Sequence, residues 1–555
     1  MQQFRLIIAI ALSFLVFLLW DFFVADKQVK NSKENLQATR TLTTKEASPE
    51  LADQTTITRK KEGLADERMR QPEKTSRIIT VTSPFYSVKI SEKGAVFNSF
   101  VLKNYRETVD VESNLKELLP IEKLKSQGSI GLAFSGDSMP GLENAFFKAD
   151  LESDSIDVYS QDKKVSFYWE SPRGIIVEKR FIFSSETYMI GLEIIVKNGS
   201  DQTIKDDLIL SLLNSVPDGA SRYGFEGPSA LIDNKLEKVK IKKIEEKNIY
   251  NGKLKWISVQ EQYFISSIIP KNVRQASMRL FLKENDILET QYVDSSVNIM
   301  PGTQQVYEYN LFMGPKSLKI LKGLNCDLDK AINFGFFDFI AKPCLWLMNF
   351  LYGFIPNYGA AIIILTILIK ILFWPLGTKS YKSMNEMKRV QPLMAEIREK
   401  YKHDKKKMNE EIMGLYKVYK INPLGGCLPM VAQIPVFFAF YQMLYGAIEL
   451  RHAPFFLWIN DLSAPDRLFS FDLAIPFMQA PYGIPVLTII MGATMFIQQK
   501  LSPAPGDPSQ AKMMMLMPIV FTVIFINFSS GLVLYWLVNN TLSIAQQYYT
   551  TKRTA

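Results

Sequence analysis

The sequence has few of the residues from which catalytic and metal sites are built. It contains 3 cysteines and 2 histidines in 555 residues, and no CxxC pair. A disulfide framework and a thiolate zinc site are therefore not indicated, and the cysteines are interpreted as small buried apolar residues. The motifs HExxH and GxxxxGK[ST] are missing, so zinc proteolysis and a P-loop ATPase lack support. We expect a protein that is not an enzyme, with no catalytic residue, metal or cofactor.

Charge is missing from long stretches of the chain. The net charge is +9, charged residues make up 22% and the mean hydropathy is +0.01. These averages hide two extremes, because residues 27–77 are almost entirely polar while long segments after residue 333 are almost free of charge. This pattern is typical of a membrane protein with a water-soluble portion, and it excludes a disordered chain and a fibre.

About six apolar segments are predicted to span the membrane. Residues 4–24 give about 20 apolar residues, enough for about 30 Å of hydrocarbon, and lack a small-residue cleavage site. Residues 1–26 are therefore interpreted as an uncleaved signal anchor. The other spans are predicted at about 357–376, 428–447, 482–498, 513–528 and 531–547. Segment 513–528 would cover only about 24 Å, so we expect local thinning of the bilayer.

The distribution of basic residues predicts the orientation. Roughly a dozen Lys and Arg lie between residues 378 and 423, whereas the segment 449–481 contains only Arg451 and Arg467. Basic loops stay in the cytoplasm, so we expect both termini to be cytoplasmic and the portion from 27 to about 330 to be exported.

The exported portion is predicted to be mostly β. Residues 27–77 lack any apolar period and read as a flexible linker. Residues 78–322 alternate β-forming residues with turn signals such as Lys197-Asn198-Gly199 and Asn251-Gly252, which predicts an antiparallel β-sandwich. A sugar-binding role for it and a structural or docking role both stay open. The membrane core is assigned to residues 330–555, and 333–350 is either a helix in the outer interface or an extension of the next span.

Segment 378–424 is predicted to be a cytoplasmic helical hairpin with a bend at Lys402-His403-Asp404. One apolar stripe in each helix is expected to join the pair. The stripes are Met384, Met387, Val390, Met394, Ile397 and Tyr401 in one helix, and Met408, Ile412, Leu415 and Tyr419 in the other.

The basic residues of this hairpin have two interpretations. For any single lysine a solvated face suffices, but as a set that includes Lys405, Lys406 and Lys407 they can bind RNA phosphates or anionic lipid head groups. No aromatic residues are interleaved to read bases, so sequence-specific nucleic-acid recognition is not expected.

Lys370 is the only charged residue inside the later spans, none of which contains Asp or Glu. An ammonium in hydrocarbon costs at least ~3 kcal/mol, so it faces water, a polar cavity or a partner, unless its stem reaches the interface. The absence of carboxylates argues against an ion-coupled transporter. Many amides and hydroxyls in the other spans, among them Thr366 and Gln433, either join helices or line a wet groove.

The membrane core resembles the YidC membrane-protein insertase family, in its long Gram-negative form. The resemblance is carried by NPLGGC, GAIELR, MGATMFIQQKLSP and SGLVLYW in this order, together with the first span, the exported sandwich and the hairpin. It extends over nearly the whole chain. The family usually has arginine where this chain has Lys370, so positive charge is kept while the planar bidentate donor is lost.

The resemblance implies an inner-membrane insertase and folding chaperone that works without nucleotide hydrolysis. Five spans would surround a hydrophilic groove open to the cytoplasm and lipid, and the large domain would be periplasmic. The implied partners are nascent membrane proteins, the ribosome, anionic lipids and the Sec translocon. Family members act either alone or beside this translocon. The implied groove residues are Lys370, Thr366, Gln433, Tyr535, Trp536 and Gln547.

The sequence leaves two other functions open. A solute transporter or channel with a sugar-binding periplasmic domain is the main alternative. An intramembrane hydrolase is a remote third, because the segment Ser529-Ser530-Gly531 has no base within the membrane and reads as a break between helices.

Overall fold

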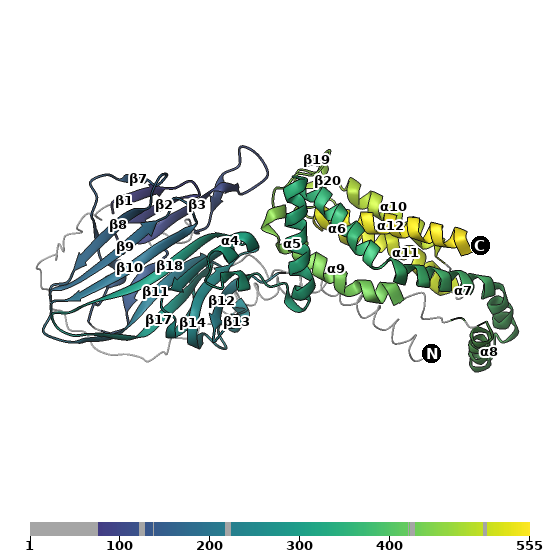
Figure 1. The fold of residues 1–555 in the computed structure, drawn as a ribbon, viewed down its shortest axis with the longest axis horizontal. Coiled ribbons are helices and arrows are strands. Elements are labelled where there is room, and N and C mark those ends of the chain that lie inside the picture. The colour runs from purple at the N-terminus through teal and green to yellow at the C-terminus, as the bar shows by residue number, and fades with distance from the viewer. Residues whose placement is uncertain are drawn as a thin grey trace, which may run out of the picture. The chain divides into compact units, whose positions relative to one another are not determined.

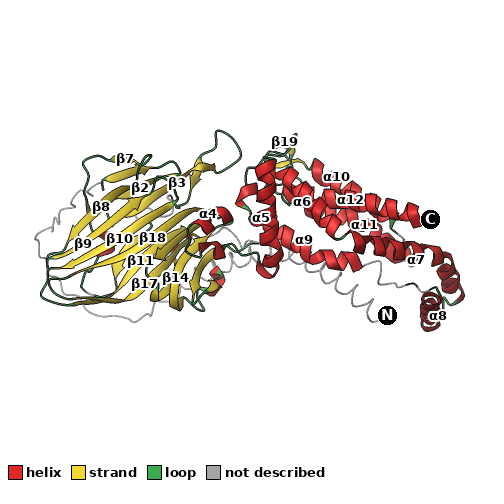
Figure 2. Cartoon of the chain, in the orientation of Figure 1, coloured by secondary structure: helices red, strands yellow, loops and turns green. Residues whose placement is uncertain are grey.

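The computed structural model describes residues 76–554 except positions 121, 123–127, 137, 217–223, 420, 422–427 and 503–507. The expected signal anchor and the expected linker up to residue 75 lie outside the described residues. Strands occupy the described chain from residue 78 to residue 315, here called the β domain, and helices prevail after it (Figures 1 and 2).

Two sheets make up the β domain. The smaller has five strands in the order β4-β3-β2-β1-β7, and its bounds are β1 Ile78–Thr82, β2 Tyr86–Ser91, β3 Val96–Arg106, β4 Leu115–Glu117 and β7 Ser155–Asp157. The larger has 13 strands, in the order β5-β11-β17-β16-β14-β15-β18-β10-β9-β8-β6, with β12 paired to β14 and β13 paired to β12. Their bounds are β5 Gly131–Phe134, β6 Lys148–Ala149, β8 Lys163–Glu170, β9 Ile175–Phe183, β10 Met189–Asn198, β11 Ile204–Ser215, β12 Gly227–Ile232, β13 Lys235–Lys238, β14 Ile249–Gln260, β15 Phe264–Pro270, β16 Arg274–Lys283, β17 Ile287–Ile299 and β18 Gln304–Pro315.

The core of the β domain lies between the two sheets. Ile190, Leu192 and Ile194 of β10 are fully buried while the residues between them are partly exposed, which is the period of a half-buried strand. Phe97 of β3 and Phe181 of β9 bring the two sheets together, with ring centroids 5.1 Å apart. The predicted antiparallel sandwich is therefore present, with one exception: β1 pairs with β7 in parallel, after a connection long enough to bring the chain back in the same direction.

The predicted turn at Asn251-Gly252 is wrong. Both residues lie inside β14, where Gly252 has φ 155°. A Cβ atom on Gly252 would stand 2.4 Å from Cγ2 of Ile232, because β12 passes close to β14 at a register shift next to Leu231. Glycine is required here by the close approach of a neighbouring strand and not by a turn.

Lys179 of β9 is buried in the core of the β domain. Its Nζ donates hydrogen bonds to the carbonyl oxygens of Ala95 and Ile130 at 2.7 Å each and of Gly94 at 3.2 Å. Three acceptors match the three protons of an ammonium, so the desolvated charge is fully hydrogen-bonded. Lys179 thereby ties the loop before β3, in the smaller sheet, to the larger sheet.

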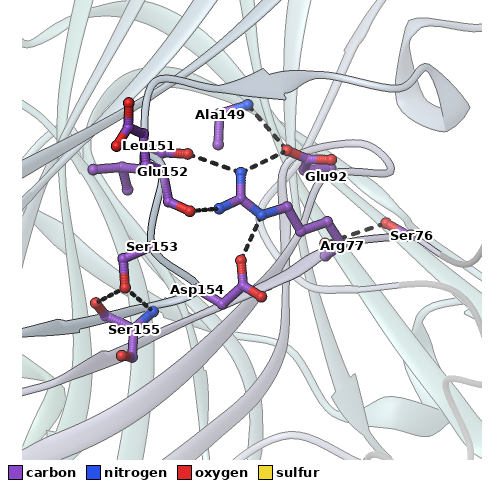
Figure 3. A network of polar contacts seen from close by, with 9 residues as sticks. All are labelled: Ser76, Arg77, Glu92, Ala149, Leu151, Glu152, Ser153, Asp154 and Ser155. Atoms are coloured by element: carbon purple, nitrogen blue, oxygen red, sulfur yellow. Dashed lines mark hydrogen bonds and ion pairs between the residues drawn. The ribbon is translucent and has the colours of Figure 1, made fainter.

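Arg77 holds the beginning of the β domain in place (Figure 3). Its guanidinium donates to Asp154 Oδ1 at 2.6 Å and to the carbonyl oxygens of Leu151 and Glu152 at 2.8 Å each. Glu92 lies 3.8 Å from the same group. The planar fork of arginine suits this simultaneous binding of a carboxylate and two carbonyls, and it fixes β1 beside β7.

Nine α-helices are described after the β domain. They are α4 Leu318–Gly323, α5 Asp338–Phe354, α6 Tyr358–Leu372, α7 Trp374–Lys400, α8 Lys405–Val418, α9 Leu428–Gly446, α10 Val486–Leu501, α11 Pro508–Phe525 and α12 Ser530–Thr554. Helix α12 packs against α6, α7, α9 and α10, so it is the central element of this region. Pro343 lies inside α5 and does not end this helix.

The predicted span 357–376 is divided between two helices. Helix α6 ends at Leu372, and α7 begins at Trp374 with Pro375 in its first turn, where a missing N–H is tolerated. Among the described residues, no single helix is both long and apolar enough to cross a membrane. The pair α6 and α7, bent by 63°, meets that criterion together, and Val486–Leu501 and Met513–Phe525 are shorter apolar helices. The number of spans stays a prediction.

Helices α7 and α8 form a hairpin with its own small core. Asp404 caps α8, accepting hydrogen bonds from the backbone N–H groups of Lys406 and Lys407. Most of the two predicted stripes lie in this core, with Tyr416 and Ile421 added, while Tyr419 is exposed. The core consists of Val390, Met394, Ile412 and Ile421, packed against Met387, Ile397, Met408, Leu415 and Tyr416.

We expect Lys179→Met to lower the free energy of unfolding of the β domain by about 2 to 4 kcal/mol, because three buried carbonyls lose their donor. Urea unfolding of the full chain in detergent, followed by pulse proteolysis, measures this change. Lys148→Met is the matched control, since Lys148 lies exposed on β6. Equal stability of the two variants would contradict the assigned role of Lys179.

Candidate functional site

Lys370 lies in the last turn of α6, where the negative end of the helix dipole favours a cation. Helix α6 begins at Tyr358, because the side chain of Asn357 accepts a hydrogen bond from the N–H of Ala360. The Nζ atom of Lys370 donates to Oγ of Ser543 in α12 at 2.6 Å. Lys370 forms no ion pair with any residue that the structure describes. Its hydrogen-bond partner is therefore a neutral hydroxyl.

The contact with Ser543 begins a series of hydrogen bonds across three helices. The hydroxyl of Ser543 donates to the carbonyl oxygen of Asn539 at 2.7 Å. Oδ1 of Asn539 accepts from Nε2 of Gln433, in α9, at 2.8 Å. Gln433 also forms a hydrogen bond with Tyr535. We call these five residues (Lys370, Ser543, Asn539, Gln433 and Tyr535) the polar chain, and it connects α6, α9 and α12.

The sequence of α12 explains why these groups share one face. Tyr535, Asn539 and Ser543 follow each other at four-residue steps, which place side chains above one another on a helix. Gln546 continues this face toward the hairpin and donates to the carbonyl oxygen of Trp374 at 2.8 Å. Gly377 permits the contact, since a Cβ atom there would lie 2.7 Å from Nε2 of Gln546.

Three of the residues that the family resemblance implied lie outside the polar chain. Thr366 is buried, and its hydroxyl donates within its own helix to the carbonyl oxygen of Ile362 at 2.7 Å. Trp536 points into an aromatic cluster, with ring centroids 4.7 Å from Phe437, and its buried Nε1 has no acceptor among the described residues. Oε1 of Gln547 is likewise buried without a donor in the described part of the chain.

Sequence reasoning missed Ser543 as a site residue and treated Asn539 only as one of many polar groups. Their spacing carried the signal, because a serine four residues after an asparagine lies on the same helical face. The sequence did not indicate that this face of α12 meets Lys370.

The lysines predicted to bind anions lie at the beginning of α8. Lys406 and Lys407 are exposed, and Nζ of Lys407 lies 5.4 Å from the ring centroid of Tyr401. The side chain of Lys405 is outside the described residues. The positive end of the helix dipole disfavours lysines at this position, and the cap Asp404 offsets that cost only in part.

Two family models match the chain in succession. One described as the YidC periplasmic domain matches residues 78–347, and one described as a 60Kd inner membrane protein matches residues 350–555. Together they cover the β domain and the helices that carry the polar chain.

Curated relatives match the chain over most of its length. The membrane protein insertase YidC of Syntrophus aciditrophicus (strain SB) is 44% identical over 478 residues, which is 86% of this chain and 85% of that protein. The membrane protein insertase YidC of Syntrophobacter fumaroxidans is 41% identical over 512 residues, covering 88% and 89%. A solved structure, an active YidC insertase with its first transmembrane domain resolved, matches 85% of this chain at 18% identity and a TM-score of 0.38.

The two family models define the class of this protein: it is an inner membrane protein with a periplasmic β-sandwich domain and a helical C-terminal part. The chain belongs to the YidC family of membrane protein insertases. The resemblance inferred from NPLGGC, GAIELR and SGLVLYW is thus confirmed, and the alternative of a solute transporter or channel finds no support.

The hydrogen bond between Gln433 and Asn539 can be tested by a double-mutant cycle. Replacing both residues by alanine, singly and together, is expected to give a coupling energy of about 0.5 to 1.5 kcal/mol, as for other hydrogen bonds between membrane helices. Denaturant unfolding of the helical region in detergent measures it. Thr541 provides the control pair with Gln433, since its hydroxyl bonds within α12 and should give a coupling energy near zero.

Proposed function

We propose that this protein inserts nascent membrane proteins into the inner membrane without nucleotide hydrolysis, and that the polar chain lines a hydrophilic groove open to the cytoplasm and to lipid. The observation that carries this proposal is the hydrogen bond of Lys370 to Ser543 in place of an ion pair. A cation with only a neutral partner still attracts an anion. The groove would expose that cation to incoming polypeptides.

Physical chemistry supports water around Lys370. An ammonium without a counter-ion in hydrocarbon costs at least ~3 kcal/mol, and one hydroxyl satisfies only one of its three protons. The remaining protons need water or another acceptor. Amide and hydroxyl groups from α9 and α12 continue the series of polar groups from Lys370 to Tyr535, which favours a hydrated groove over a single snorkelling side chain.

The short helices support a shortened path across the bilayer. Helix α6 has 15 residues and α10 has 16, so each spans only about 22 to 24 Å at 1.5 Å per residue. The bilayer thins around helices that are too short for it. A substrate's polar flank would enter the groove, pair transiently with Lys370 through an acidic residue, and leave when its apolar segment moves into lipid.

We further propose the orientation and the partners. Helices α6 and α9 to α12 form the five-helix core, with both termini and the hairpin in the cytoplasm and the β domain in the periplasm. The hairpin binds ribosomes or anionic lipids through the lysines at the beginning of α8, including Lys405. Thr366, Trp536 and Gln547 belong to the walls of the same groove, and the protein acts alone or beside the Sec translocon.

Charge reversal at Lys370 tests the groove. We expect Lys370→Glu to slow the insertion of substrates with acidic exported segments roughly tenfold or more, because a charge-assisted contact of about 1.5 to 3 kcal/mol becomes a repulsion. Lys370→Arg should retain most activity, since it keeps the charge. Insertion into liposomes during synthesis, assayed by protease protection, gives the rates.

A substrate without acidic residues in its exported segment is the control for that experiment. Its insertion should respond much less to Lys370→Glu than that of the acidic substrate. If both substrates were affected equally, the charge of Lys370 would have no role in recognition.

Replacing Lys405, Lys406 and Lys407 by glutamate tests the hairpin. We expect weaker co-sedimentation with ribosomes or with anionic vesicles and a shallower dependence of binding on salt, because fewer counterions are released. Lys417→Glu, at the opposite end of α8, should have a much smaller effect per charge. Binding that does not respond to salt in the unmodified protein would refute this role.

A further inference from the structure

The loop between α9 and α10 exposes large apolar side chains. This outer loop, residues 452–484, contains the short strands β19 Leu468–Phe471 and β20 Tyr482–Ile484. Five of its apolar side chains are more than half exposed: Phe456 58%, Leu457 85%, Phe469 72%, Leu473 73% and Phe477 54%. Soluble surfaces rarely gather so many exposed apolar groups on one short segment.

Most charged groups of the outer loop point toward the protein. Asp466 is buried and accepts hydrogen bonds from Nε1 of Trp458 and from the N–H of Leu487, at the beginning of α10. Asp461 accepts from the N–H of His452 at 3.0 Å. The outer loop therefore holds these two carboxylates by hydrogen bonds while five of its large apolar side chains face outward.

Hydrogen bonds hold the outer loop against the break between α11 and α12. The guanidinium of Arg467 donates to the carbonyl oxygens of Pro481 and Ile526 at 2.9 Å each. The side chain of Asn527 donates to the carbonyl oxygen of Phe477 at 2.7 Å. The backbone N–H of Ser530 donates to the carbonyl oxygen of Ala464, also at 2.7 Å. These contacts satisfy the carbonyl groups of Pro481, Phe477 and Ala464 within the protein, which a hydrocarbon environment requires of each backbone group that it surrounds.

Three of these exposed residues have a left-handed backbone conformation. Leu457, Phe469 and Phe477 have φ angles of 59°, 53° and 67°. Such angles are unfavourable for residues with bulky side chains. Backbone strain at residues whose apolar side chains are exposed points to an apolar surrounding that covers them.

We infer that the outer loop inserts these side chains among the acyl chains of the outer leaflet. Lipid is favoured over a protein partner because the apolar surface continues along the sequence through Ile484 into Ile489 and Ile490, which are exposed on α10. Asp472, the exposed charged residue of this loop, sets the depth, since its carboxylate stays with the head groups while Leu473 enters below them. This inference rests on the orientation proposed above.

Insertion of the outer loop would help to set the depth of the helical core in the membrane. Helix α10 is too short for a bilayer of ordinary thickness, and apolar groups at its outer end hold the outer leaflet close to that end. The loop would thus fix the helical core at the depth at which the polar chain faces the inner half of the membrane.

Fluorescence quenching in liposomes tests this inference on the full chain. Cys326, Cys344 and Cys427 are replaced by serine, and the fluorophore NBD is attached to a single cysteine at position 457 or 473. Position 490 on α10 is the lipid-facing reference, and position 159, where Tyr159 is 53% exposed in the β domain, is the aqueous reference. Spin-labelled lipid with a shallow doxyl group and aqueous iodide are the two quenchers.

We expect the spin-labelled lipid to quench the labels at positions 457 and 473 several-fold more than the label at position 159. Iodide should quench them as little as it quenches the label at position 490. Quenching by iodide as strong as at 159 would overturn the inference. Shielding from both quenchers would also overturn it, in favour of a protein partner or a second copy. Neither readout depends on insertion activity, so failure here is distinct from failure of the Lys370 experiment.

The leaflet is determined by a cysteine at Asn460, an exposed polar residue of the same loop. A membrane-impermeant maleimide should modify it in spheroplasts and not in inverted vesicles. Modification only in inverted vesicles would place the loop at the cytoplasmic surface and overturn the assignment to the outer leaflet.

Discussion

The need to satisfy an ammonium among apolar helices organises the helical region. Lys370 finds its acceptor on α12, and the same face of α12 supplies Asn539 to Gln433 of α9. A polar side chain in an apolar surrounding is stable only where a partner stands within hydrogen-bond distance, so each of these contacts restricts how two helices can pack. The central place of α12 therefore has a polar cause as well as a steric one, and Gly377 serves it by making room for Gln546.

The buried Lys179 and the half-buried Lys370 differ in how many of their protons have an acceptor. Lys179 donates to three backbone carbonyls, whose positions the strands fix. Lys370 donates to a single hydroxyl among the described residues. A fully satisfied ammonium has nothing left to offer a ligand, so Lys179 is structural. An incompletely satisfied one keeps donor capacity, and this difference supports a substrate-binding role for Lys370 better than its burial alone does.

The features that the sequence predicts well are those that depend on a regular period. Two-residue alternation located strands such as β10, and helical periodicity located most of the apolar core of the hairpin. Predictions based on local residue types failed where a distant segment decides the conformation. Gly252 is a glycine because Ile232 passes beside it, and no turn is present. The position of Lys370 could be predicted from composition, but Ser543 could not, because which helical faces meet is a property of the whole bundle.

The same limitation explains the residues that the family resemblance implied. Tyr535 and Trp536 are neighbours in sequence, yet they point into different surroundings, since successive residues on a helix diverge by about 100°. Tyr535 belongs to the polar chain, whereas Trp536 packs against Phe437. Such a wall, with one polar and one aromatic side, would suit the proposed groove: its polar side would receive the hydrophilic flank of a substrate, and its aromatic side would border the apolar segment that leaves for lipid.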